Sequence, residues 1–157
     1  MNGDAATLVE DHGFVRLHRK WESGDSIELD LAVPPRLVQS HPKNSANYEK
    51  LAIARGPLIY CLEHADNPSI DIFSTVLPVD IELTERRGHP ELGDVVTLSG
   101  DALIRNDNES DGNPYRTYDP KHAAEYSTLQ ITAIPYFSWA NRGRHSMLTA
   151  MPYLRRS

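Results

Sequence analysis

The first third of the chain shows the clearest alternation of apolar and polar positions. Apolar side chains occupy every second position from residue 27 to residue 33, namely Ile27, Leu29, Leu31 and Val33. Because successive side chains of a strand point to opposite faces, this period of two predicts a strand with one wet and one dry face. A similar alternation over residues 14–21 precedes it, and Glu22-Ser23-Gly24-Asp25 between them predicts a hairpin turn.

Two apolar segments follow in the middle of the chain, at residues 51–54 and 58–62. The Gly56-Pro57 pair between them predicts a turn or bulge, because proline cannot donate to a strand ladder. The second segment is apolar on both faces, which predicts a central strand. Cys61 within it is then expected to be a small buried hydrophobic residue, since no surroundings that would lower a thiol pKa are visible.

The remaining strand signals are short and separated by loops. They cover residues 37–38, 72–73, 76–77, 79–83, 95–98, 129–133 and 147–151, with a charged loop over 86–90 and an exposed polar excursion over 105–124. Eleven prolines and nine glycines divide the chain into pieces too short for most helices. We therefore predict an all-β fold, an antiparallel and jelly-roll-like β-sandwich with irregular loops. It is expected to form one domain over residues 1–157, with residues 1–12 flexible.

Aromatic and polar side chains are densest between Ile134 and Gly143. This stretch combines Tyr136, Phe137 and Trp139 with Asn141 and Arg142, just before a turn glycine. Two interpretations are open. The side chains could form a sugar-binding platform made of Tyr136, Trp139, Asn141 and Arg142, or an aromatic core cluster whose Asn and Arg tie down a loop. His41, in the loop before Pro42, is a further candidate for a binding pocket.

Composition narrows the class of protein. The 157 residues are enough for a real hydrophobic core, and the apolar fraction of 39% is too high for a disordered chain. Sixteen basic residues against twenty-two acidic ones are scattered along the sequence, so nucleic acid is not an expected partner. Apolar runs are shorter than the roughly 20 residues that a membrane span needs, and no N-terminal signal peptide is recognisable. These features predict a soluble, cytoplasmic domain.

The search for catalytic or metal-binding patterns yields only weak candidates. Residues 107–112 match the first half of a calcium loop, but the position of its bidentate Glu is taken by Tyr118. One cysteine excludes an internal disulfide and a multi-cysteine metal site. Two acid pairs, Glu63 with Asp66 and Glu82 with Glu85, could serve glycoside chemistry only if the fold places them in a cleft. The residues therefore predict a domain without a visible catalytic constellation.

Three blocks of the sequence, in order, resemble a known family. They are Phe14 to Leu17 leading to Trp21–Leu29, the segment Leu51 to Glu63 with its Arg-Gly-Pro, and Ile134-Pro135-Tyr136 with Trp139–Gly143. Together they resemble the C-terminal β-sandwich region of glycoside hydrolase family 127, the β-L-arabinofuranosidase-like proteins. Residues 70–125 match that region only loosely.

The resemblance implies an accessory domain rather than a catalytic one. In that family, catalysis belongs to a helical α/α barrel with a cysteine nucleophile and a zinc site of Glu and Cys ligands, and this chain carries no such barrel. No catalytic residue and no cofactor can therefore be assigned to it, and Cys61 does not lie at the nucleophile position. The leading hypothesis is a domain that braces the barrel of a parent enzyme acting on L-arabinofuranosides or related glycosides.

Two other functions remain open. A stand-alone carbohydrate-binding module would need an exposed Trp139 for stacking, whereas a buried Trp139 favours the bracing role. An autonomous hydrolase would need acids that converge in a cleft. The resemblance further implies that the chain exposes a sheet edge and the face that docks on the barrel, which predicts a homo-oligomer or strand exchange.

Overall fold

The computed structural model describes residues 1–106, 115, 117 and 124–155. Contacts divide the chain into two compact units, residues 1–32 and residues 33–157, where the sequence suggested a single domain. All secondary structure in the described residues is β-strand or short 3₁₀ turn, which confirms the all-β class.

The first unit contains little regular structure. Its only ladder joins β1 (Glu10–Asp11) to β2 (Phe14–Val15) across a turn in which His12 and Gly13 both have positive φ. The turn predicted at Glu22–Asp25 is present, with the Asp25 N–H donating to the Glu22 carbonyl at 3.1 Å. The strands predicted on either side of it are wrong, since residues 16–21 and 27–33 are not strands. Ladder hydrogen bonds need a partner strand, and alternation alone does not supply one.

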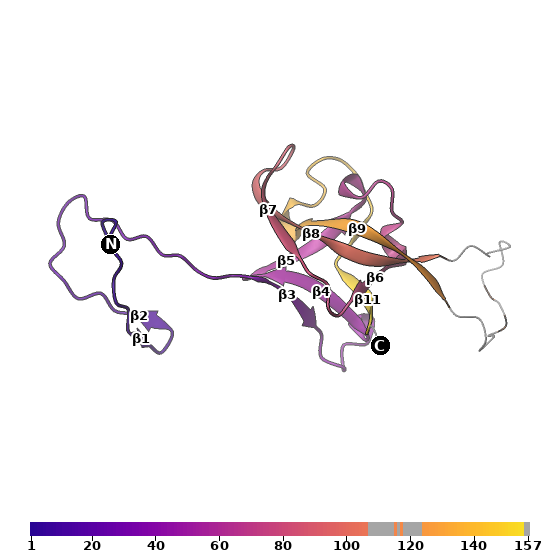
Figure 1. Ribbon diagram of the computed structural model, residues 1–157, viewed down its shortest axis with the longest axis horizontal. Coiled ribbons are helices and arrows are strands. Elements are labelled where there is room, and N and C mark those ends of the chain that lie inside the picture. Colours follow the sequence, from indigo (N-terminus) through magenta and orange to yellow (C-terminus); the bar gives the residue numbers. More distant parts are fainter. Residues whose placement is uncertain (107–114, 116, 118–123, 156–157) are drawn as a thin grey trace. The chain divides into compact units, whose positions relative to one another are not determined.

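The second unit is built from a ring of six strands (Figure 1). Following the hydrogen bonds around the ring, the strands are β4 (Lys50–Arg55), β5 (Leu58–Glu63), β9 (Glu125–Pro135), β8 (Gly93–Asn106), β6 (Thr75–Pro78) and β11 (Ala150–Leu154). β11 pairs back to β4, which closes the ring. Every neighbouring pair is antiparallel except β6 with β11.

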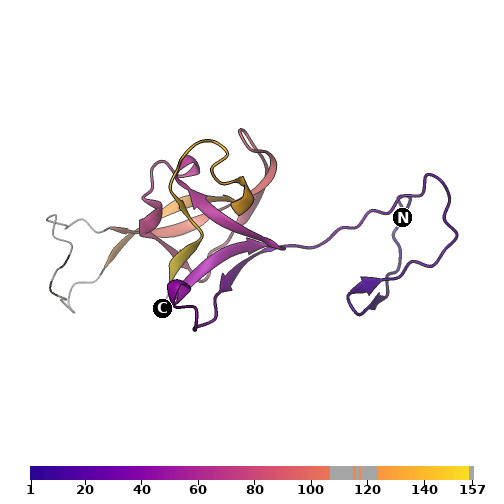
Figure 2. The same cartoon turned by 180° about the vertical axis from the view of Figure 1, so that it is seen from behind.

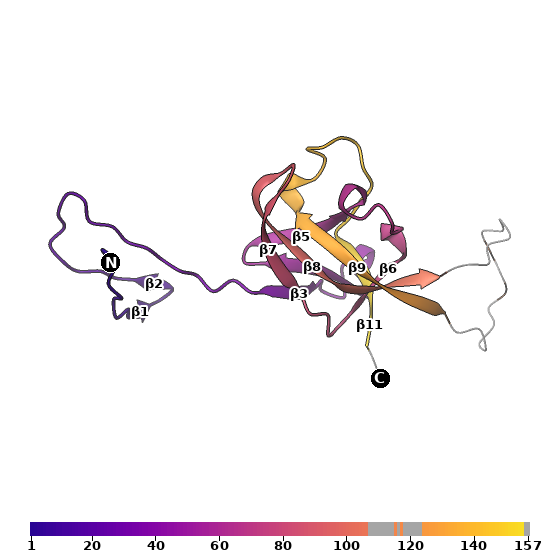
Figure 3. The ribbon, with the colours of Figure 1, turned by 45° about the horizontal axis from the view of Figure 1, so that its top comes forward.

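The closed ring corrects the predicted arrangement of two stacked sheets. A sandwich leaves edges on both sheets, whereas a ladder that returns to its first strand makes a barrel. Three further strands extend the ring: β3 (Pro35–Gln39) pairs with β4, β7 (Thr84–His89) with β8, and β10 (Met147–Leu148) with β5. Figure 3 shows the long β8 and β9 crossing the front of this barrel.

Several local predictions are confirmed and others are corrected. The Gly56-Pro57 turn joins β4 to β5 as a two-residue hairpin loop with Gly56 at a φ of +53°. The charged stretch predicted as a loop over 86–90 is mostly β7, which pairs with β8. The single return strand predicted over 147–151 is two strands, because β10 pairs with β5 whereas β11 pairs with β4 and β6. Residues 79–83 are not a strand.

The barrel interior is filled by apolar side chains from all six ring strands and the η3 turn (Ile72–Ser74). The cluster consists of Leu51, Ile53, Tyr60, Leu62, Ile70, Ile72, Leu77, Leu98, Ala102, Ile104, Ile131, Ala133 and Met151. Cys61 is a buried free cysteine, as predicted, and burial raises the pKa of its thiol to about 12. The thiol is therefore protonated at neutral pH and is not a nucleophile there.

The second unit also depends on close backbone packing at Gly100 in β8. A Cβ atom at this position would lie 2.7 Å from the backbone carbonyl oxygen of Glu82. Only glycine allows the chain to approach β8 this closely. The exposed excursion predicted over 105–124 falls mainly outside the described residues, although the β8–β9 ladder extends to the pair Asn106 and Glu125.

Candidate functional site

The loop that follows β9 has a defined local shape. Residues Tyr136–Ser138 form the 3₁₀ turn η4, and the Trp139 N–H donates to the Tyr136 carbonyl at 3.2 Å. Residues 139–144 form turns and bends, and Ala140 and Gly143 have positive φ values of +63° and +121°. The turn predicted at Gly143 is thereby confirmed, and its backbone conformation favours glycine.

Arg142 anchors this loop to the end of β5. Its Nη2 donates to Glu63 Oε2 at 2.6 Å and to Asp66 Oδ2 at 2.5 Å, and its Nη1 donates to Asp66 Oδ1 at 2.7 Å. The Arg142 side chain is only 7% exposed and that of Glu63 is fully buried. Asp66 also pairs with His89 Nε2 at 2.9 Å, and the Ala140 N–H donates to Glu63 Oε1 at 3.3 Å. We call Glu63, Asp66, His89 and Arg142 the buried ion-pair cluster.

The buried ion-pair cluster joins three segments that are distant in sequence. The first segment holds Glu63 at the end of β5 and Asp66 in the adjoining η2 turn (His64–Asp66). The second holds His89 at the end of β7, and the third holds Arg142 in the loop after β9. Two parallel hydrogen bonds between a guanidinium and a carboxylate fix both geometry and distance. These bonds to Asp66 and Glu63 hold the pKa of Arg142 above its usual range.

The acid in the centre of the cluster is held in its ionised form. Burial on its own raises the pKa of the Asp66 carboxyl, but hydrogen bonds from Arg142 and His89 lower it below its ordinary value. Both oxygens of Asp66 and both oxygens of Glu63 already accept hydrogen bonds. The Glu63 and Asp66 pair considered for glycoside chemistry therefore has no open face toward a substrate, and it has a structural role in this domain.

The aromatic side chains of the same loop behave differently from Arg142. The rings of Tyr136 and Trp139 stack with their centroids 6.2 Å apart and an angle of 24° between their planes. Tyr136 and Phe137 are exposed, and Trp139 is 37% exposed. Trp139 is therefore exposed, and its ring stacks on that of Tyr136. This is the exposure expected of a stacking residue, and the buried Trp139 expected for the bracing role is not observed.

The structure brings together only some of the predicted site residues. Tyr136, Trp139 and Arg142 share one loop, but the guanidinium of Arg142 faces Glu63 and Asp66, which matches its interpretation as a loop anchor. Asn141 is exposed on that loop. His41 is exposed in the β3–β4 loop, where its Nδ1 accepts from the Lys43 N–H at 3.2 Å. Figures 1 and 2 show these two loops at opposite sides of the barrel.

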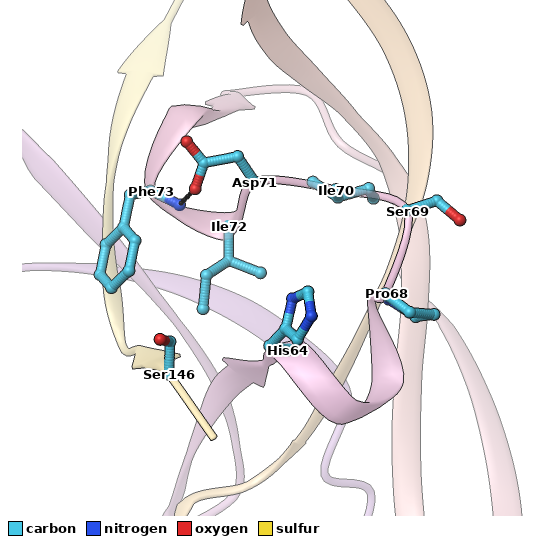
Figure 4. Close-up of a pocket in the computed structure, with 8 residues that line it drawn as sticks. All are labelled: His64, Pro68, Ser69, Ile70, Asp71, Ile72, Phe73 and Ser146. Atoms are coloured by element: carbon cyan, nitrogen blue, oxygen red, sulfur yellow. Dashed lines mark hydrogen bonds between the residues drawn. The ribbon is translucent and has the colours of Figure 1, made fainter. Parts of the chain in front are cut away.

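A shallow pocket of about 380 Å³ lies beside the anchored loop (Figure 4). It is lined by His64, Pro68, Ser69, Ile70, Asp71, Ile72, Phe73 and Ser146. The Asp71 carboxylate is occupied in capping η3, accepting from the Phe73 N–H at 3.1 Å and from Ser74 Oγ at 2.8 Å. The imidazole of His64 is the other titratable group in the lining.

Sequence reasoning missed most of this arrangement. His89 was placed in a loop, and His64 and Phe73 were not recognised as pocket residues. The signal available was indirect: Glu63 follows a fully apolar run, and a charge that ends a buried strand requires a partner. The sequence could not identify that partner, because Arg142 lies 79 positions away.

The described residues contain neither a metal-binding cluster nor a membrane-spanning helix. In that part of the chain, no group of three or more His, Cys, Asp or Glu residues is arranged to hold a metal ion. The calcium-like stretch at 107–112 lies outside it. None of the helical segments described is long and apolar enough to cross a membrane.

Comparison with known proteins assigns the family of this all-β barrel. The model of the glycoside hydrolase family 127 C-terminal domain matches residues 35–152. The chain therefore belongs to this family of C-terminal domains, which confirms the resemblance seen in the sequence.

Full-length relatives are much longer than this chain. A non-reducing end β-L-arabinofuranosidase of Bifidobacterium longum subsp. longum is 31% identical over 147 residues, which are 90% of this chain and 22% of that protein. The crystal structure of a GH127 β-L-arabinofuranosidase from Geobacillus stearothermophilus T6 is 30% identical, with a TM-score of 0.66 over 78% of this chain and 18% of its own. A solved glycoside hydrolase is 32% identical, with a TM-score of 0.79 over 98% of this chain and 25% of its own.

Proposed function

We propose that this chain is a non-catalytic accessory domain of a glycoside hydrolase of family 127, and that it stabilises the catalytic part of that protein. The parent activity proposed is hydrolysis of L-arabinofuranosides or related glycosides, by analogy with the relatives named above. A catalytic barrel domain is then the expected partner, and carbohydrate is a partner of the parent protein.

The observation that carries this proposal is the state of the Glu63 and Asp66 pair. Arg142 forms ion pairs with both of these acids inside the protein. A buried salt bridge of this kind fixes geometry and gives no proton to a substrate. The match to a C-terminal domain, over about a fifth of a relative's length, agrees with a supporting role.

The anchored loop gives the proposal a structural basis. Its backbone is fixed by the buried ion-pair cluster, and it presents the exposed Tyr136 and Phe137 together with the partly exposed Trp139. Exposed aromatic residues on a rigid loop are typical of a surface that a partner covers. We propose that this loop contributes to the contact with the catalytic part.

A chimera tests the proposed function. The region of the Bifidobacterium longum enzyme that matches this chain would be deleted, or replaced by this chain through a covalent junction. Deletion should lower the midpoint of thermal unfolding and the activity on a β-L-arabinofuranoside, and replacement should restore most of the thermal stability. A deletion variant with unchanged stability and activity would overturn the proposal.

Calorimetric titration of the isolated chain with L-arabinose and short arabinosides tests the alternative of a carbohydrate-binding module. The accessory role predicts no measurable heat. Binding that is lost in Trp139→Ala but kept in Phe137→Ala would instead assign a sugar site to the Tyr136 and Trp139 stack. Phe137→Ala is the matched control, because it removes an exposed aromatic residue from the same turn without breaking the stack.

A further inference from the structure

The first unit leaves a row of large apolar side chains in solvent. Ile27, Leu29 and Leu31 are 54%, 62% and 64% exposed, although they occupy alternate positions of one segment. The residues between them, Glu28, Asp30 and Ala32, are exposed as well. A single exposed apolar residue is ordinary on a protein surface, but three at alternate positions of one segment mark an interaction surface.

The backbone of the same segment also has no partner strand among the described residues. Ladder pairings among the described residues do not include positions 27–34. A row of unpaired N–H and C=O groups beside an apolar stripe is the arrangement that another strand can join. The segment therefore combines both elements of strand pairing, a side-chain face and open hydrogen-bonding groups.

The first unit is too small to bury this stripe by itself. It spans 32 residues and contains no cysteine, since Cys61 is the single cysteine of the chain. Units of fewer than about 40 residues usually need disulfides, metals or a partner to be stable. The alternation over residues 27–33 thus indicates a strand whose partner is not provided by residues 1–32.

The start of the segment is already shaped for pairing. The Ser26 N–H donates to Asn2 Oδ1 at 2.7 Å, and the Asn2 N–H donates to the Ser26 carbonyl at 3.1 Å. The turn before it is fixed by Asp25, whose Oδ2 accepts from the Glu22 N–H at 3.0 Å, and this bond lowers the pKa of the Asp25 carboxyl. A segment with a fixed entry loses less conformational entropy when it pairs.

We infer that residues 26–33 pair as a β-strand with a sheet of the same family 127 protein that lies outside this chain, with Ile27, Leu29 and Leu31 packed in the apolar core of that sheet. This inference rests on the proposed function, because it names the contact through which the accessory domain joins its parent. The family's C-terminal domain model begins only at residue 35, so residues 26–33 precede that domain.

The lengths of the relatives favour this occupant. The solved glycoside hydrolase aligns with 98% of this chain, so nearly all of residues 1–34 has a counterpart there, outside the C-terminal domain. This chain in turn covers only 25% of that protein and 22% of the Bifidobacterium longum enzyme. The polypeptide of such relatives that has no counterpart here is large enough to contain the complementary sheet.

The test uses two triple variants of the chimera described above. In the apolar variant Ile27, Leu29 and Leu31 are replaced by Ser, and in the control variant Glu28, Asp30 and Ala32 are replaced by Ser. Both variants put three serines into the same segment, but on opposite faces of the inferred strand. The apolar variant should lower the midpoint of thermal unfolding by roughly 10 °C, whereas the control should change it by less than about 3 °C.

The outcomes separate this inference from the proposed function. In one outcome, the chimera without further substitutions is more stable than the deletion variant, while its apolar and control variants unfold at the same temperature. This result would overturn the inference and leave the proposed function intact. A chimera no more stable than the deletion variant would overturn both. Sedimentation of the isolated chain provides the remaining outcome: a dimer that the apolar variant dissociates and the control variant keeps would assign the strand to a second copy and contradict the inferred occupant.

Discussion

Two segments of this protein carry a strand signal in the sequence, but only one of them forms strands in the structure. Residues 27–33 alternate apolar and polar side chains, and residues 51–62 form two further apolar runs around a Gly-Pro turn. In the structure the second pair of runs becomes β4 and β5, in which Leu62 is fully buried. In the first segment Leu29 remains largely exposed and no strand is formed.

Both patterns predict a strand, and the segment that forms one is the segment that has partner strands. β5 has three neighbouring strands, β4, β9 and β10, which cover its backbone groups and its side chains. Periodicity reports that a segment could present one apolar face, but burial of that face depends on another element of complementary pattern. A strong strand signal without a partner therefore points to a missing contact.

The largest expected effect concerns the buried side of this comparison. Arg142→Met should cost about 3–5 kcal/mol of unfolding free energy, because it leaves the buried Glu63 and Asp66 without their cation. Urea unfolding followed by circular dichroism measures this cost. Arg144→Met, an exposed arginine two positions away, is the matched control and should stay within about 0.5 kcal/mol of the parent chain. A cost below about 1 kcal/mol for Arg142→Met would show that the cluster acts like a surface ion pair.

The same substitution in the two segments tests the comparison directly. Leu62→Ala should cost about 2–5 kcal/mol, because it opens a cavity in the barrel core. Leu29→Ala should cost less than about 0.5 kcal/mol in the isolated chain, because its side chain is already in water. Chemical unfolding of both variants provides the measurement, and equal costs would remove the distinction between the segments.

Backbone packing gives a smaller effect. Gly100→Ala should cost about 1–3 kcal/mol, since the new Cβ would lie 2.7 Å from the Glu82 carbonyl oxygen and the backbone must shift. Thermal unfolding measures the loss, with Ser99→Ala on the same strand as the control. A Gly100→Ala variant as stable as its control would mean that residues 81–82 can move away from β8 at little cost.

The acid dependence should be the most gradual effect. The folded-state pKa of Asp66 lies below its ordinary value of 3.8, so its contribution to stability is complete above that value and is lost as the pH falls through the folded-state pKa. Unfolding midpoints between pH 6 and pH 2.5 should decrease less in Asp66→Asn than in the parent chain. Asp101→Asn, at an exposed position of β8, should follow the parent chain. If Asp66→Asn and the parent chain had the same pH profile, the lowered pKa of Asp66 would be contradicted.

Much of the barrel could be predicted from the sequence, because its strands carry local signals. The Gly56-Pro57 turn, the burial of Cys61 and the strand before Pro135 were all visible in composition and period. Closure of the ring was not visible, since it depends on β11 pairing with β4 and β6, about 100 and 76 positions away. The sequence does not predict β7, because its exposed and charged side chains do not alternate with apolar ones.

The candidate site could also be predicted only in part. The sequence located the loop around Trp139 and left open whether Arg142 binds a sugar or ties down the loop. Only the structure shows the guanidinium between Glu63 and Asp66. Which residues of a loop face inward is decided by partners from other strands, and a local pattern carries no record of them.

Hydrogen exchange of the isolated chain, followed residue by residue, tests the central claim most directly. If the two segments differ only in having a partner, amides of residues 27–33 should exchange at nearly unprotected rates while those of β4 and β5 are slowed by several orders of magnitude. Protection of residues 27–33 comparable to that of β4 would contradict the account, because the apolar stripe would then already be paired within this chain.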